Sequence, residues 1–284
     1  MIRKIYRLYR KLMIGRPSKR LYKFMITDWT KLTDLEACSK VLDTKRFNRN
    51  LQPLELDYPD AKRILVIAPH PDDDIIGAGG TLIKAKEKSA DIHVLYVTNG
   101  LPEQAEAIRK ETISVCQQLG STPHFLDCEA RAIPLDNPDV NRKVSELLDE
   151  LKPETIFISF LLDDHDDHRR VNHLLLEVLK DKPLLKCEIW AYQVYSTVIP
   201  NVAVNIKKQK ERKKELIHIW KSVGKFNDLA HYILGVNASN CRYINSKEPV
   251  WVETFFVVSL EDYLELCAQY FIDKETYYYN SYND

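Results

Sequence analysis

Two short polar clusters hold residue types that bind metal ions and move protons. The segment HPDDD (70–74) follows the apolar run RILVIA (63–68), and the segment DDHDDH (163–168) follows the apolar run TIFISFLL (155–162). Together they supply several carboxylates and three histidines, His70, His165 and His168. Crowded carboxylates raise one another's pKa values unless a positive charge lies among them. A divalent cation with imidazole and carboxylate ligands would supply that charge.

Such a cation suits hydrolytic chemistry. A catalytic metal site leaves one position for water, which the metal acidifies, and a carboxylate outside the coordination sphere takes the proton. Two histidines, one ligating aspartate and one spare aspartate would meet these needs. Taken alone, the first cluster is typical of a turn or helix cap, and the second is typical of a surface. Their pairing after two strand-like runs favours a metal site.

A parallel sheet would bring the two clusters together. Strand-like runs at 63–68, 91–100, 124–128, 155–162 and 187–196 alternate with helical patterns at 77–89, 105–120, 139–152 and 169–180. This alternation predicts an α/β, Rossmann-like fold, with a mainly parallel sheet and helices on both faces. Ligands of such sheets bind beyond the carboxyl ends of the strands, where both clusters are expected.

The glycine-rich segment GAGG (77–80) lacks the spacing of a dinucleotide fingerprint or a phosphate-binding loop. We therefore expect it to allow close packing of the start of a helix on a strand, and not to bind a cofactor. The six cysteines are scattered without a CxxC pair, which is typical of reduced thiols and predicts no zinc ligand among them.

Composition narrows the function classes. The 284 residues include 41 Lys and Arg against 41 Asp and Glu, so no net charge draws the molecule to nucleic acid. No apolar run is long enough to span a bilayer, and the N-terminus has no apolar core of a secretory signal. We therefore expect a cytoplasmic protein.

The N-terminal part is expected to form an extension, residues 1–60, ahead of a catalytic domain at 61–284. LQPLELDYPDA (51–61) has the composition of a linker. Residues 1–14 place apolar side chains on one helical face with Arg and Lys around it. This pattern fits peripheral contact of residues 1–27 with an anionic membrane at its inner surface, and equally a helix packed on its own domain or on a partner subunit.

The segments APHPDDDIIGAGGTL (68–82) and DDHDDHRRV (163–171) resemble the two signature motifs of the PIG-L/LmbE-like family of zinc-dependent N-deacetylases. The resemblance covers about residues 62–260. It implies a hydrolase that removes the acetyl group from an N-acetylated sugar, of the N-acetylglucosamine type, in a glycoconjugate or sugar nucleotide. It also implies zinc as the cofactor, with iron as the alternative metal.

The resemblance extends to single residues. It implies that His70, Asp73 and His168 bind the metal and that Asp72 is the general base. It also implies that His165 stabilises the oxyanion and protonates the leaving amine.

Two further assignments follow from the resemblance. Asp167 corresponds to the acid that orients His165, and Arg109 corresponds more loosely to an arginine that contacts the sugar. Asp74 and Asp166 depart from the family pattern, which commonly has Glu and Pro there.

The resemblance leaves the sugar carrier and the oligomeric state open. The alternatives are another metal-dependent amide hydrolase and a membrane-surface binding protein with a vestigial site.

Overall fold

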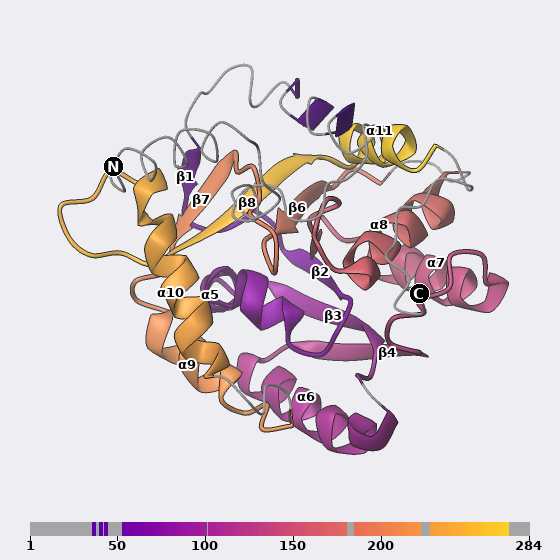
Figure 1. Cartoon of the computed structure of the whole chain (residues 1–284), viewed down its shortest axis with the longest axis horizontal. Coiled ribbons are helices and arrows are strands. Elements are labelled where there is room, and N and C mark those ends of the chain that lie inside the picture. Colours follow the sequence, from indigo (N-terminus) through magenta and orange to yellow (C-terminus); the bar gives the residue numbers. More distant parts are fainter. Residues whose placement is uncertain are drawn as a thin grey trace, which may run out of the picture.

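The computed structural model describes residues 36–37, 40–41, 43–44, 53–100, 102–180, 185–222 and 228–272. In this part of the chain, eight strands form one sheet in the order β1-β7-β8-β6-β5-β2-β3-β4 (Figure 1). The strands are β1 Leu54–Leu56, β2 Arg63–Ala68, β3 Asp91–Thr98, β4 Thr122–Cys128, β5 Thr155–Ser159, β6 Glu188–Tyr192, β7 Val202–Asn205 and β8 Val252–Ser259.

The sheet is parallel except for β8, which runs antiparallel to both of its neighbours, β6 and β7. The central strands β2 and β5 pair with each other, and every residue of β5 is buried. This burial on both faces explains their continuous apolar runs. The predicted α/β fold with a mainly parallel sheet is confirmed.

Helices cover both faces of the sheet, as predicted. One hydrophobic core packs α7, α8 and α11 against one face, and a second core packs α5, α6, α9 and α10 against the other (Figure 1). The helices are α5 Asp73–Glu87, α6 Ala105–Leu119, α7 Pro138–Leu151, α8 Asp166–Leu179, α9 Lys210–Ile217, α10 Leu229–Ser239 and α11 Leu260–Tyr270.

Two helices begin earlier than their apolar periodicity predicted. α5 begins at Asp73 and not at residue 77, and α8 begins at Asp166 and not at residue 169. Both first turns are rich in aspartate, which the positive end of a helix dipole stabilises. The two polar clusters therefore form the N-terminal turns of helices that follow β2 and β5.

The expected linker at 51–61 contains a strand. Leu54–Leu56 pairs in parallel with Val202–Val204, and the Leu54 N–H donates to the Asn201 carbonyl at 2.9 Å. A three-residue edge strand is too short to give a readable periodicity. Ala37 and Val41 are also buried in the core beside α7, α8 and α11, so part of the expected extension packs on the sheet. The predicted helix at 1–14 and the predicted membrane contact of 1–27 lie outside the described residues.

The glycines of GAGG provide close packing, as predicted. A Cβ on Gly77 would lie 2.2 Å from Cδ2 of Tyr192 in β6. A Cβ on Gly80 would lie 2.6 Å from Cγ2 of Ile206, directly after β7. These contacts set α5 close against the sheet and fix the position of its first turn.

The described cysteines, Cys116, Cys128, Cys187, Cys241 and Cys267, are free thiols. Among the described residues, every helix is too short or too polar to cross a membrane.

Candidate active site

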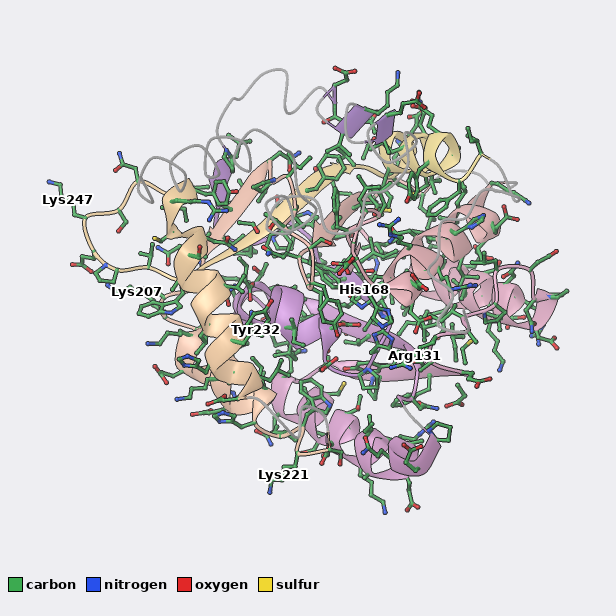
Figure 2. All side chains as sticks on the ribbon, in the orientation of Figure 1. Arg131, His168, Lys207, Lys221, Tyr232 and Lys247 are labelled. Carbon is green, nitrogen blue, oxygen red and sulfur yellow. The ribbon has the colours of Figure 1, made fainter. Side chains whose placement is uncertain are left out.

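The two polar clusters meet at the carboxyl ends of the central strands β2 and β5. β2 and β5 are parallel neighbours, so the segments that follow them leave the sheet side by side. His70 lies in the turn after β2, and His168 lies in the first turn of α8, near the centre of the molecule (Figure 2). The ring centroids of the two histidines are 5.3 Å apart.

Three side-chain atoms form a nearly equilateral triangle. His70 Nδ1 lies 3.2 Å from Asp73 Oδ2 and 3.3 Å from His168 Nε2. Asp73 Oδ2 lies 3.2 Å from His168 Nε2. Ligand atoms about 3.3 Å apart are expected around a tetrahedral ion with bonds of about 2.0–2.1 Å. The ligand atoms of His70, His165 and His168 also lie within 4.8 Å of one another. The donor types and spacing therefore fit a zinc-sized cation.

Two buried carboxylates hold the outer nitrogens of these histidines. Asp167 Oδ2 lies 2.9 Å from His70 Nε2 and accepts from the Arg131 N–H at 2.6 Å. Asp163 Oδ1 lies 3.1 Å from His168 Nδ1. Carboxylates placed behind histidine ligands fix the orientation of the ring and raise its basicity.

This geometry differs from the role expected of Asp167. Its carboxylate was expected to orient His165, but its described hydrogen bonds go to His70 and Arg131. Asp163, which the sequence analysis did not single out, takes the equivalent place behind His168. It also accepts from the Tyr195 N–H at 3.1 Å. Its position as the first acid of DDHDDH was the signal that could have identified it.

The charges of the cluster favour a cation at the triangle. Burial lowers the pKa of His70, but hydrogen bonds to Asp167 and Asp73 raise it to about 9. Burial likewise lowers the pKa of His168, but Asp73 and Asp163 raise it to about 10. The same imidazoles hold the pKa of Asp73 far below its usual value, against the effect of burial. The carboxylates thus stabilise positive charge at the triangle, which a metal between neutral imidazoles would also supply.

Asp72 has a different environment from Asp73. It is 8% exposed, and its backbone φ of 140° lies where non-glycine residues are strained. Such strain costs about 1–3 kcal/mol and is concentrated at functional sites. Burial and the neighbouring Asp73 charge raise the pKa of Asp72 well above its usual value. A buried carboxylate with a raised pKa beside a cation site suits a general base.

His165 is held as a neutral hydrogen-bond donor. The Asp167 main-chain N–H donates to its Nδ1 at 3.1 Å, so the proton of the neutral ring lies on Nε2. Burial, and then the positive charges of His168 and His70, lower the pKa of His165 to about 4. This tautomer suits hydrogen-bond donation from Nε2, and the expectation that His165 protonates the leaving amine stays a prediction.

Asp74 and Arg109 lie apart from the triangle. Asp74 accepts from the Tyr96 hydroxyl at 2.9 Å, and burial raises its pKa to about 7. Arg109 donates to Asp127 at 2.6 Å and lies 4.0 Å from the centroid of the Phe125 ring, at β4. No described contact joins Arg109 to the histidines, so its role in substrate binding stays a prediction.

Tyr195 forms a wall of the site that the sequence analysis missed. Its ring lies 5.7 Å from that of His165 and 5.3 Å from that of His168, measured between centroids. Tyr195 is nevertheless open to solvent, with 54% of the residue exposed. Asp163 fixes the main chain here by accepting from the N–H groups of Tyr195 and Ser196, both at 3.1 Å. Tyr195 follows β6 in an irregular segment, so its direction could not be read from periodicity.

Comparisons with known proteins agree with this geometry. The family model described as PIG-L, GlcNAc-PI de-N-acetylase, matches residues 65–179, a range that includes both polar clusters. Diacetylchitobiose deacetylase of Thermococcus kodakarensis is 27% identical over 158 residues, which cover 51% of this chain and 57% of that protein. The chain thus spans little more than half the length of this curated relative.

Solved structures share the fold. N,N'-diacetylchitobiose deacetylase from Pyrococcus horikoshii superposes with a TM-score of 0.60 at 23% identity, covering 81% of this chain and 94% of that one. GalB, the 4-carboxy-2-hydroxymuconate hydratase from Pseudomonas putida KT2440, gives a TM-score of 0.59 at 18% identity, covering 69% and 96%. Because one neighbour is a deacetylase and the other a hydratase, the fold by itself does not decide the reaction.

Proposed function

We propose that this chain, whose residues 65–179 match the PIG-L family of de-N-acetylases, hydrolyses the acetamido group of an N-acetylated sugar. The observation that carries the proposal is the triangle of His70 Nδ1, Asp73 Oδ2 and His168 Nε2, with the buried carboxylate of Asp72 near it. Amide hydrolysis needs both parts: a place for a Lewis acid and a base that is not its ligand.

We propose that zinc binds to His70, Asp73 and His168, with iron as the alternative. The bound ion would polarise the amide carbonyl and acidify a water molecule at the site. Asp163 and Asp167 would hold the outer nitrogens of the two histidines, so that the inner nitrogens face the ion.

The chain's own residues then carry the proton transfers. Asp72 takes a proton from the attacking water as the new C–O bond forms, which its raised pKa favours. The Nε2–H of His165 donates a hydrogen bond to the developing oxyanion. Asp72 returns the proton to the nitrogen as the C–N bond breaks, which releases acetate and the free amine.

Tyr195 is proposed to bind the sugar ring. Its half-exposed aromatic face borders His165 and His168, which suits contact with the apolar face of a pyranose. Tyr195→Ala should raise KM by about tenfold with little change in kcat, since a stacked aromatic contact contributes about 0.5–1.5 kcal/mol. Tyr195→Phe, which keeps the ring, should behave like the wild type. A Tyr195→Ala variant with unchanged KM would exclude this contact.

The test of the proposed function is acetate release by zinc-loaded and iron-loaded protein. The substrates are N-acetylglucosamine, N,N'-diacetylchitobiose, an N-acetylated sugar nucleotide and an N-acetylglucosamine glycolipid. We expect acetate and free amine in equal amounts from at least one substrate, and release slowed by about 10²–10⁴-fold in Asp72→Asn loaded with the same metal. Absence of acetate from the whole panel, with metal bound, would refute the proposal and favour another amide as the substrate.

A further inference from the structure

One lysine of the basic segment KKQKERKKEL (207–216) is buried. Lys213 of α9 is fully enclosed, and its ammonium group contacts three acceptors. Nζ donates to Glu253 Oε1 at 2.7 Å, to the Ile76 carbonyl at 2.8 Å and to Asn237 Oδ1 at 3.1 Å. An ammonium has three protons to donate, so all three can be used here.

Its partner Glu253, at the start of β8, is buried to the same degree. Glu253 Oε1 accepts from the Gly80 N–H at 2.8 Å. Its Oε2 accepts from the N–H and the hydroxyl of Thr81 at 2.8 and 2.6 Å. The ion pair therefore binds the backbone of α5 at both ends of one helical turn, at the Ile76 carbonyl and at the Gly80 and Thr81 N–H groups.

These contacts use the two groups that pair with each other in a regular helix. The N–H of residue 80 normally donates to the carbonyl of residue 76. In this protein, the Ile76 carbonyl accepts from Lys213, and the Gly80 N–H is directed at Glu253. The ion pair thus contacts α5 where its first turn meets the remainder of the helix.

From these contacts we infer that Lys213 and Glu253 are positioning residues for the N-cap and first turn of α5, which carry Asp72 and Asp73. The inference rests on the proposed function of those two aspartates. The link is short, because the Ile76 N–H donates to the Asp72 carbonyl at 2.9 Å while the Ile76 carbonyl receives Lys213. A buried ion pair is a poor source of stability, since apolar replacements are often as stable. Removing the ion pair should therefore change the geometry of the first turn of α5 more than the stability of the protein.

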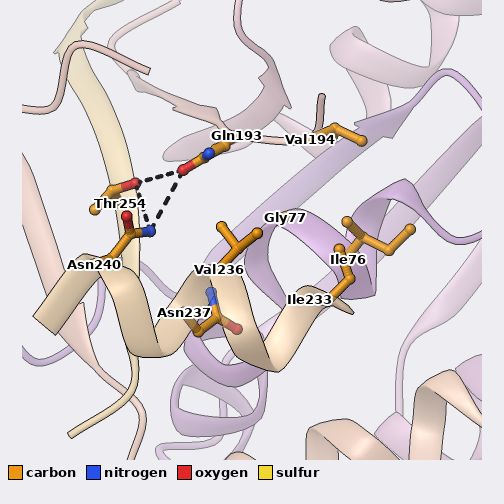
Figure 3. A pocket seen from close by; sticks show the side chains of 9 residues that line it. All are labelled: Ile76, Gly77, Gln193, Val194, Ile233, Val236, Asn237, Asn240 and Thr254. Carbon is orange, nitrogen blue, oxygen red and sulfur yellow. Dashed lines mark hydrogen bonds between the residues drawn. The ribbon is translucent and has the colours of Figure 1, made fainter. Parts of the chain in front are cut away.

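The same lysine joins the first turn of α5 to a neighbouring pocket. Asn237 of α10 lines this pocket together with Ile76 and Gly77, and it also accepts from Lys213 (Figure 3). Its amide nitrogen donates to the Val252 carbonyl at 3.2 Å, beside Glu253. Helix α10, strand β8 and the start of α5 are thus held by one network.

The test compares the full-length double variant Lys213→Met/Glu253→Gln with the wild type. Changing both residues avoids the unpaired buried charge that either single change leaves. Without the ion pair, the Ile76 carbonyl loses its lysine donor and the Gly80 and Thr81 N–H groups lose their charged acceptor, so the first turn of α5 and Asp73 can shift. We expect cobalt(II) to bind about 10–100-fold more weakly, with an altered visible spectrum, and kcat for acetate release to fall more than KM changes.

The control is Asn201→Ala, which removes buried hydrogen bonds to the main chain of Val257 at the opposite end of β8. It should lower the thermal midpoint and leave the cobalt affinity and spectrum unchanged. Lys213→Gln/Glu253→Gln, which restores a donor and an acceptor without charge, should recover part of the cobalt affinity.

Cobalt affinity and spectrum like those of the wild type in Lys213→Met/Glu253→Gln would overturn the inference and leave the ion pair a structural role. Wild-type protein that binds cobalt but releases no acetate would refute only the proposed function. In that case the cobalt readout still decides the positioning role. Wild-type protein that fails to bind cobalt would overturn both.

Discussion

Asp72 and Asp73 are neighbours in sequence, but their carboxylates face different surroundings. Asp73 Oδ2 lies 3.2 Å from both His70 Nδ1 and His168 Nε2, whereas Asp72 is buried on a strained backbone beside the charge of Asp73. Histidine neighbours lower the pKa of Asp73, and burial raises that of Asp72. Two adjacent residues of one type are thereby suited to two tasks, metal binding and proton transfer.

The two aspartates should be separable by mutation. Asp72→Asn should keep its zinc and lose kcat by about 10²–10⁴-fold, the range for a lost general base. Asp73→Asn should lose zinc after dialysis, because the triangle loses its one negatively charged atom. Metal content per chain and the rate of acetate release measure the two effects. Loss of zinc in Asp72→Asn would mean that the roles are exchanged.

The carboxylates behind the histidines give a second prediction. Asp163→Asn and Asp167→Asn should each weaken metal binding by about 10–100-fold, because each aspartate holds the outer nitrogen of a histidine that we propose as a ligand. Competition with a chromophoric chelator measures this affinity. If Asp167 instead acts mainly on His165, its asparagine variant will keep the metal and lose only kcat.

At the residue scale, the proximity of His70, Asp73 and His168 could be predicted from the sequence. Both clusters follow apolar runs that pair as parallel strands, so their meeting was predictable. The contacts of Asp163 and the position of Tyr195 were not predictable. They depend on where the chain passes after β6, and no periodic pattern determines that path.

At the scale of elements, α5 combines the start of the site with close packing on the sheet. Gly77 permits the Tyr192 ring to contact the helix backbone, and the hydroxyl of that ring donates to the Ile67 carbonyl at 2.9 Å. The ring is therefore held at both ends. The positions of Asp73 and of the sheet are coupled through this contact.

Alanine substitutions at two glycines should have opposite effects. Gly77→Ala would place a Cβ 2.2 Å from Tyr192 and should destabilise the protein by about 1–3 kcal/mol through overpacking. Gly235→Ala in α10, where a Cβ meets no atom within 4 Å, should stabilise it by about 0.5–1 kcal/mol. Urea unfolding measures both. Equal stability of the two variants would contradict the packing role of Gly77.

The sequence predicted the elements up to β6 well and those beyond it poorly. From Arg63 to Tyr192, each strand-like run feeds a helix with a clear apolar face, and the helices end at residues such as Gly120, which has a left-handed φ of 79°. After β6, the order changes: β7 is short, and β8 inserts antiparallel. The buried Lys213 also lies in a segment whose composition is typical of a solvated helix face.

At the scale of the whole molecule, the carboxyl ends of β2 and β5 are only one part of the sheet, and strands β3 and β4 respond to pH separately. His124 of β4 and His93 of β3 share a short contact of 2.9 Å between ring nitrogens. Burial, and then the charge of His93, lower the pKa of His124.

This pair predicts an acid-sensitive contribution to stability. The unfolded chain takes up a proton at His124 near pH 6.5, whereas the native state resists it to lower pH. The unfolding free energy should therefore fall as pH drops below about 6.5, and His124→Gln should remove this contribution. Urea unfolding of both proteins between about pH 7.5 and 5 tests it. Parallel pH profiles of the two proteins would exclude the effect.

The insertion of β8 between β6 and β7 has a consequence for biosynthesis. Both of its neighbours precede it in the chain, and β1 and β7 join the remaining strands only through it. A nascent chain on the ribosome can thus assemble the central strands and both polar clusters, but it cannot close the sheet until residues 252–259 have been translated. Glu253, which binds the backbone of α5, arrives in that same segment. The contacts of Glu253 with α5 therefore form only when nearly the whole described fold has been synthesised, and a prematurely terminated chain would lack them.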